Sequence, residues 1–74
     1  MTLTESIKEI EDDIIKVLTE NQPIDLSQDE LYAHTHLKNK AEFGWSFAIE
    51  KLEKKKLIKV SRTIGKGVIL YKLA

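Results

Sequence analysis

The segment 45–60 constrains the fold more than any other part of the chain. Apolar residues recur in it at helical spacing: Trp45, Ala48, Ile49 and Leu52. Three consecutive lysines follow, and lysine charges favour the carboxyl end of a helix, where the helix dipole leaves partial negative charge. A run rich in β-branched residues, 57–60, comes next. The pattern predicts a helix followed at once by a strand that turns back over the same apolar stripe.

Length and composition limit the classes of protein to which the chain can belong. With 74 residues the chain forms one domain, 1–74, with a modest core. It has no cysteine, which excludes disulfides and thiolate metal sites. No apolar run approaches the length of a membrane span, and the acidic N-terminus is unlike a secretory signal. We therefore expect a cytoplasmic protein that does not enter a membrane.

The charge is divided between the two halves of the chain, although the whole chain is neutral. Residues 1–37 carry two lysines and nine acidic residues, a net charge of −7, whereas residues 38–74 carry ten cations and three acidic residues, a net charge of +7. A basic half suggests a surface for a polyanion, with the acidic half turned away from it. The alternative is that the two halves form solvated surfaces that merely differ in the sign of their charge, with no polyanion bound to either.

The first half of the sequence predicts two helices with a short strand between them. Residues 4–20 are predicted to form a helix, because their apolar residues recur at helical spacing and make one stripe. Thr4 is the expected N-cap, and Pro23 ends the helix. Residues 24–26 alternate as a very short strand does. Ser27 and Glu30 have the spacing of a capping box, which starts a second helix running towards His36 or Leu37.

The second half predicts a helix and a β-hairpin. The third helix begins at Ala41 or Glu42 and ends near Lys55. Strands follow at 57–62 and 68–73, and the glycines of the loop 63–67 supply the positive φ angles of a tight turn. The expected fold is α+β and mostly α: a three-helix bundle with a small antiparallel hairpin, in the order α-β-α-α-β-β.

Three segments of this pattern resemble the winged helix-turn-helix domains, of the kind found in small MarR-like and LexA-like regulators. The segments are SQDEL at 27–31, AIEKLEKKKLIKV at 48–60 and TIGKGVILYKL at 63–73. The family often has glycine after the LEKK motif, where this chain has Lys56. The resemblance implies a double-stranded DNA-binding protein that acts as a small transcriptional regulator. Because a lone domain of this size would make few contacts with DNA, we expect a homodimer.

The resemblance also implies which residues would touch DNA. The third helix would lie in the major groove, and the hairpin, or wing, would reach phosphates or the minor groove. Cations neutralise phosphates and release counterions, and an asparagine can pair with an adenine edge. We expect these cations and polar residues to converge on one convex surface. The expected DNA-binding residues are Lys38, Asn39, Lys40, Ser46, Arg62, Thr63 and Lys66.

Other functions remain as alternatives to DNA binding. Phe43 and Phe47 lie four residues apart and could form an apolar patch for a protein partner, together with the acidic first helix. His34 and His36 lack a third ligand at metal spacing, so we expect no metal and no other cofactor. No catalytic motif is present: the GKG segment lacks the spacing of a phosphate-binding loop, and we expect no enzyme activity.

Overall fold

A computed structural model describes residues 3–37 and 42–74 of the chain. The described part has three helices and a three-stranded antiparallel sheet with strand order β1-β3-β2. The predicted α+β class and the element order are confirmed, and the arrangement is compatible with a winged helix, although only about half of the chain is helical. The elements are α1 (Leu3–Glu20), β1 (Leu26–Ser27), α2 (Gln28–Ala33), α3 (Glu42–Lys54), β2 (Ile58–Ile64) and β3 (Val68–Leu73).

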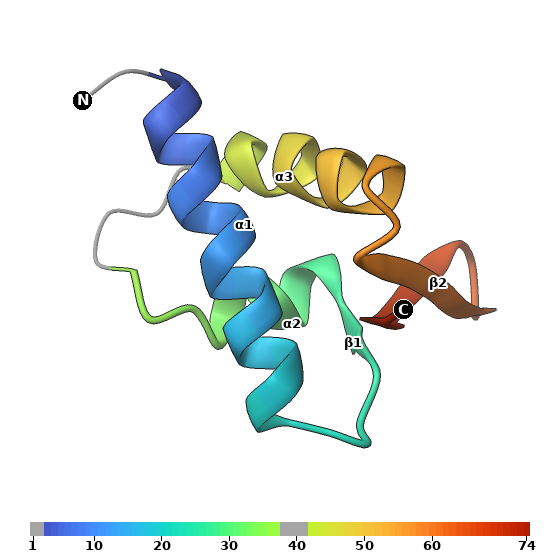
Figure 1. The fold of residues 1–74 in the computed structure, drawn as a ribbon. Helices are drawn as coiled ribbons and strands as arrows, with labels where there is room; N and C mark the ends of the chain where they lie inside the picture. Colours follow the sequence, from blue (N-terminus) through green and yellow to red (C-terminus); the bar gives the residue numbers. More distant parts are fainter. Residues whose placement is uncertain (1–2, 38–41) are drawn as a thin grey trace.

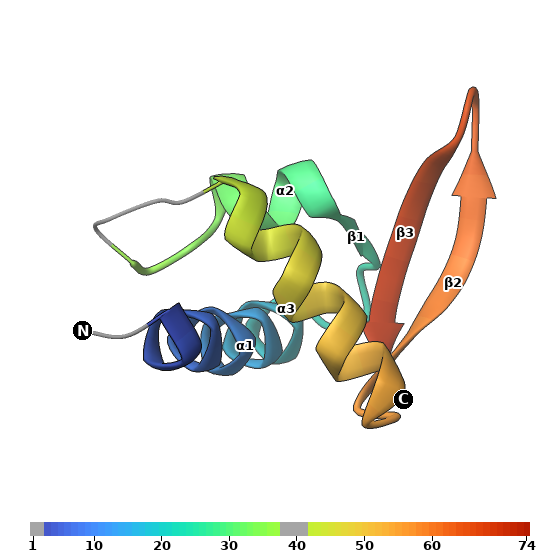
Figure 2. The same ribbon diagram turned by 90° about the horizontal axis from the view of Figure 1, so that it is seen from above.

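The helices lie together and the hairpin of β2 and β3 extends away from them. In Figure 1, α3 crosses one end of α1, and the sheet lies at the carboxyl end of α3. Figure 2 shows the turn of the hairpin as the part farthest from α1. The molecule is elongated as a result, with extents of 36 × 24 × 23 Å.

The core lies where the apolar stripes of the helices meet one face of the sheet. The predicted stripe of α3 is confirmed, since Trp45 and Ala48 are fully buried and Ile49 and Leu52 are nearly so. The Trp45 ring packs edge-on against Tyr32, with ring centroids 5.0 Å apart. Other core residues come from every remaining element: Ile7, Ile10, Ile14, Val17, Leu18, Leu26, Leu31, Ile58 and Tyr71.

The turn after α3 adopts a conformation that usually requires glycine. Lys56 has a φ of 61°. Its N–H donates to the Glu53 carbonyl at 3.0 Å, and the Leu57 N–H donates to the Leu52 carbonyl at 3.0 Å. This pair of hydrogen bonds is the Schellman motif, which satisfies carbonyls at a helix end and reverses the chain. The lysine run therefore does end the helix, as predicted, and a left-handed lysine directs the chain into β2.

Two predicted boundaries in the first half were wrong by small amounts. The first helix begins at Leu3, so Thr4 lies inside its first turn and is not the N-cap. The short strand is Leu26–Ser27 rather than 24–26, because only these two residues pair with β3, and Ile24 is 63% exposed. The capping box is confirmed: the Glu30 N–H donates to Ser27 Oγ at 3.2 Å, and the Ser27 N–H donates to Glu30 Oε1 at 3.0 Å.

The second helix is shorter than predicted, and it ends at Ala33 rather than at His36 or Leu37. Contacts with α1 explain the early end. The Thr35 hydroxyl donates a hydrogen bond to the Asp13 carboxylate, and the His36 backbone N–H donates to the same carboxylate at 3.1 Å. His36 Nε2 also lies 2.6 Å from Glu20 Oε1. These contacts attach the residues after α2 to α1, so they do not continue the helix.

The hairpin is longer than predicted and contains a β-bulge. Strand β2 continues to Ile64, so the turn is confined to residues 65–67. The register shifts between Val60, which pairs with Tyr71, and Arg62, which pairs with Leu70. Ser61 is the extra residue. Since side chains alternate along a strand, this insertion moves Arg62 and Ile64 to the opposite face from Ile58.

Candidate nucleic-acid interface

The hairpin carries four exposed cations: Lys59, Arg62, Lys66 and Lys72. None of them forms an ion pair with another residue that the structure describes. Lysines of the helix end differ, because Lys54 Nζ lies 3.3 Å from Glu50 and Lys55 Nζ lies 3.0 Å from Glu11. No acidic residue follows Glu53 in the sequence. The hairpin is therefore a segment with four exposed cations and no acidic residue.

Three of these cations share the face of the sheet that points away from the helices. Lys59 and Lys72 are directly opposite each other, and the bulge brings Arg62 to the same face. Like charges at directly opposite positions destabilise a strand pair. An anion bound at this face would relieve that repulsion.

The turn at the end of the hairpin presents Lys66 between two glycines. Gly65 and Gly67 have φ angles of 55° and 89°, which residues other than glycine rarely adopt. A Cβ atom placed on either glycine would meet nothing within 4 Å, so both of these positions face open space. The Lys66 side chain is exposed and accessible to phosphate oxygens.

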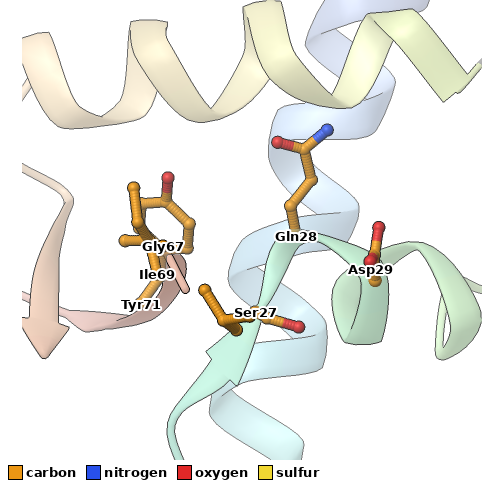
Figure 3. A pocket seen from close by; sticks show the side chains of 7 residues that line it. Ser27, Gln28, Asp29, Gly67, Ile69 and Tyr71 are labelled. Atoms are coloured by element: carbon orange, nitrogen blue, oxygen red, sulfur yellow. The ribbon is translucent and has the colours of Figure 1, made fainter. Parts of the chain in front are cut away.

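A groove lies between α2 and the hairpin. Gln28 Nε2 donates a hydrogen bond to Ser46 Oγ at 3.0 Å, which links the start of α2 to the exposed side of α3. Gln28 also lines a groove of about 310 Å³ between α2 and β3 (Figure 3). The groove is lined by Ser27, Gln28, Asp29, Gly67, Val68, Ile69 and Tyr71. Gln28 thus contacts Ser46 of α3 and also lines the groove beside the hairpin.

The groove itself is a poor place for a phosphate. Asp29 is exposed on its α2 side and would repel an anion, whereas the cations lie on the hairpin at its other side. Burial raises the pKa of the Tyr71 phenol, and the nearby Glu53 carboxylate raises it further, so the phenol stays neutral. Phosphates would therefore contact the hairpin rather than the groove floor.

The structure places four of the seven expected DNA-binding residues. Ser46 is exposed on α3, and Arg62, Thr63 and Lys66 are exposed on the hairpin. Lys38, Asn39 and Lys40 lie outside the described residues, as does the expected convergence of Lys40 with Lys66. The Phe43 side chain is also outside the described part, whereas Phe47 is 54% exposed on α3.

Sequence reasoning missed several residues of this surface. It did not connect Gln28 with Ser46, because the two are 18 positions apart. It did not select Lys59 and Lys72, which the strand register places directly opposite each other. Counting outward from the turn would not pair them, because Lys59 lies seven positions before Lys66 and Lys72 six positions after it, and only the bulge at Ser61 aligns the two.

Other kinds of site find few candidate residues. Among residues 3–37 and 42–74, no three histidine, aspartate or glutamate side chains are grouped so that they could hold a metal ion. Within the same described ranges, no helix has both the length and the apolar character needed to cross a membrane. No protein-family model matches this sequence, and no match is found among curated proteins.

Proposed function

We propose that the protein binds double-stranded DNA as a winged helix and acts as a small transcriptional regulator in the cytoplasm. In this proposal α3 enters the major groove, while the β2–β3 hairpin contacts phosphates and the neighbouring minor groove. A single domain of this size makes few contacts, so the active form would be a homodimer that binds two half-sites.

One observation carries the proposal: the hairpin that follows the carboxyl end of α3 has four exposed cations and no acid, and none of these cations forms an ion pair with another described residue. Arg62 and Lys66 would each neutralise a phosphate and release a condensed counterion. The Ser46 hydroxyl could donate to a phosphate or a base, because its oxygen accepts a hydrogen bond from Gln28 and its proton is left for DNA. Helix α1, which carries most of the acidic residues of the first half, lies away from the hairpin turn (Figure 2), so its charge would weigh little on a duplex held by the hairpin.

The test is a titration of fluorescently labelled duplex DNA at low and moderate salt. Binding should weaken steeply as salt rises. The Arg62→Ala/Lys66→Ala variant should bind more weakly to every sequence, and the slope of log K against log salt should fall by about 2.

The control is Lys8→Ala/Lys16→Ala, which removes the same charge from exposed positions on α1. It should leave the salt slope unchanged. Absence of binding by the wild-type protein at low salt would refute DNA binding. Equal loss of affinity in the two variants would mean that only net charge matters, and the hairpin would then have no specific role. Sedimentation of the complex would count the subunits.

A protein partner remains the second candidate function, and the exposure of Phe47 favours it. A 54% exposed phenylalanine on α3 could insert into a partner's apolar pocket, with the acidic α1 as a second contact. Such a contact would be nearly indifferent to salt. If the wild-type protein shows no salt-dependent DNA binding but a partner requires Phe47, this second function replaces the first.

A further inference from the structure

The end of the hairpin exposes two apolar side chains next to its cations. Ile64 is 45% exposed and Val68 is 47% exposed. They are directly opposite each other in the strand pairing, at the last positions before the turn. Cross-strand neighbours of this kind touch, so the two side chains form one apolar patch. An exposed patch at a projecting end requires an explanation, because core packing does not provide one.

The charge around this patch indicates what could cover it. Arg62 precedes Ile64 on the same face, and Lys66 lies in the turn between Ile64 and Val68. A second copy of the hairpin would bring these cations against identical cations. Strand β2 is at the edge of the sheet, and its cations and bulge also oppose pairing with another strand. The surroundings of the patch complement a polyanion instead.

The shape of the turn fits a narrow space. The glycines at 65 and 67 add no side chains, and nothing surrounds the positions where their Cβ atoms would be. Proteins that bind the minor groove often insert apolar side chains between base pairs, which unstacks one step and kinks the duplex. The cations beside such a wedge hold the phosphates on the two groove edges.

We infer that Ile64 and Val68 form an apolar wedge that enters the minor groove of duplex DNA and partly unstacks one base step. Arg62 and Lys66 bind the flanking phosphates and hold the wedge in place. The inference rests on the proposed function and extends it: the hairpin deforms its DNA as well as neutralising it. Flexible pyrimidine–purine steps would be preferred, because they unstack most easily.

The test uses the full chain and a duplex that carries 2-aminopurine at a TA step, since the fluorescence of this base rises when it unstacks. Donor and acceptor dyes at the two ends of the same duplex report bending. The variant Ile64→Thr/Val68→Thr keeps β-branched side chains but makes both partly polar. The control Val60→Thr alters a side chain of similar exposure, 46%, farther from the turn.

Wild-type protein should raise the 2-aminopurine signal and bend the duplex. The double variant should abolish both changes and lower affinity about tenfold, because apolar contact is lost. Its salt slope should equal that of the wild type, since no cation is removed. The Val60→Thr control should behave as the wild type does. Urea unfolding of each variant confirms that the fold is intact.

Each contrary result has a distinct meaning. Salt-dependent binding without unstacking or bending would overturn the wedge and leave the proposed function standing. Absence of DNA binding would overturn both. Binding to vesicles rich in phosphatidylserine that is lost in the double variant, without any DNA deformation, would assign the patch to a lipid surface. A dimer that the double variant dissociates in sedimentation, again without DNA deformation, would assign it to a second copy.

Discussion

Replacing Lys56 with glycine should stabilise the protein, although the substitution removes a side chain. Lys56 has a φ of 61°, in the left-handed region that brings Cβ close to the following carbonyl. The hydrogen bonds of the Lys56 and Leu57 N–H groups to the end of α3 depend on this conformation. Glycine adopts it without steric cost, so Lys56→Gly keeps the Schellman motif and removes the strain.

The magnitude is the balance of two opposing effects. A left-handed conformation costs a residue with a Cβ atom about 1–2 kcal/mol. Glycine loses about 0.5–1 kcal/mol more backbone entropy than alanine when the chain folds. The free energy of unfolding should therefore be about 0.5–1 kcal/mol higher for Lys56→Gly than for Lys56→Ala. The alanine variant is the proper reference, because both variants lose the lysine charge near the helix dipole.

Urea unfolding followed by circular dichroism measures these differences. In a domain of this size, 1 kcal/mol corresponds to a shift of about 4–8 °C in Tm. Lys51→Gly serves as the matched control, because Lys51 is exposed within α3 and glycine there should destabilise by about 1 kcal/mol. If glycine lowered stability at both positions, Lys56 would not be left-handed in solution, and this account of how α3 ends would be wrong.

Three further predictions concern other parts of the fold. Ser27→Ala should lower the free energy of unfolding by about 1 kcal/mol in urea titrations, because it removes the side-chain cap at the Glu30 N–H. Burial, and then the Glu53 carboxylate, raise the pKa of Tyr71 above 10.0. As pH rises, the unfolded chain therefore loses the Tyr71 proton before the folded protein does. The contribution of Tyr71 to the free energy of unfolding should be fully present below about pH 10 and be lost as pH rises through the folded-state pKa. The Tyr71→Phe variant should not show this loss. Phe47→Ala should change thermal stability by less than about 0.5 kcal/mol, because its side chain is largely solvated; a loss of several kcal/mol would place Phe47 in the core.

The sequence predicted the features that depend on periodicity and local capping. The apolar stripe from Trp45 to Leu52, the capping box at Ser27 and a glycine-containing hairpin turn within 63–67 all follow from the spacing of a few neighbouring residues. Such features are local, so no knowledge of distant contacts is needed to find them.

The features that it missed depend on contacts between distant residues. The α2 helix ends early because Asp13, more than 20 positions away, accepts hydrogen bonds from Thr35 and His36. Alternation along β2 predicts that Arg62 and Ile64 share a face with Ile58, and only the bulge at Ser61 reverses this. The positive charge of the second half was predictable from the sequence, but which cations of the hairpin share a face was not.

The bulge is also fixed from outside the hairpin. The Ser61 hydroxyl donates to the Asp25 carboxylate, and Asp25 directly precedes β1, on the far side of the central strand β3. This hydrogen bond therefore spans the sheet and holds the bulge of the hairpin against the start of β1. Asp25 would thus help to set the angle between the hairpin and the helices, although it lies outside the candidate interface. That angle fixes the distance between α3 and the hairpin turn, the two parts proposed to contact DNA. Changes at Asp25 could adjust that span during evolution while every contacting side chain stayed the same.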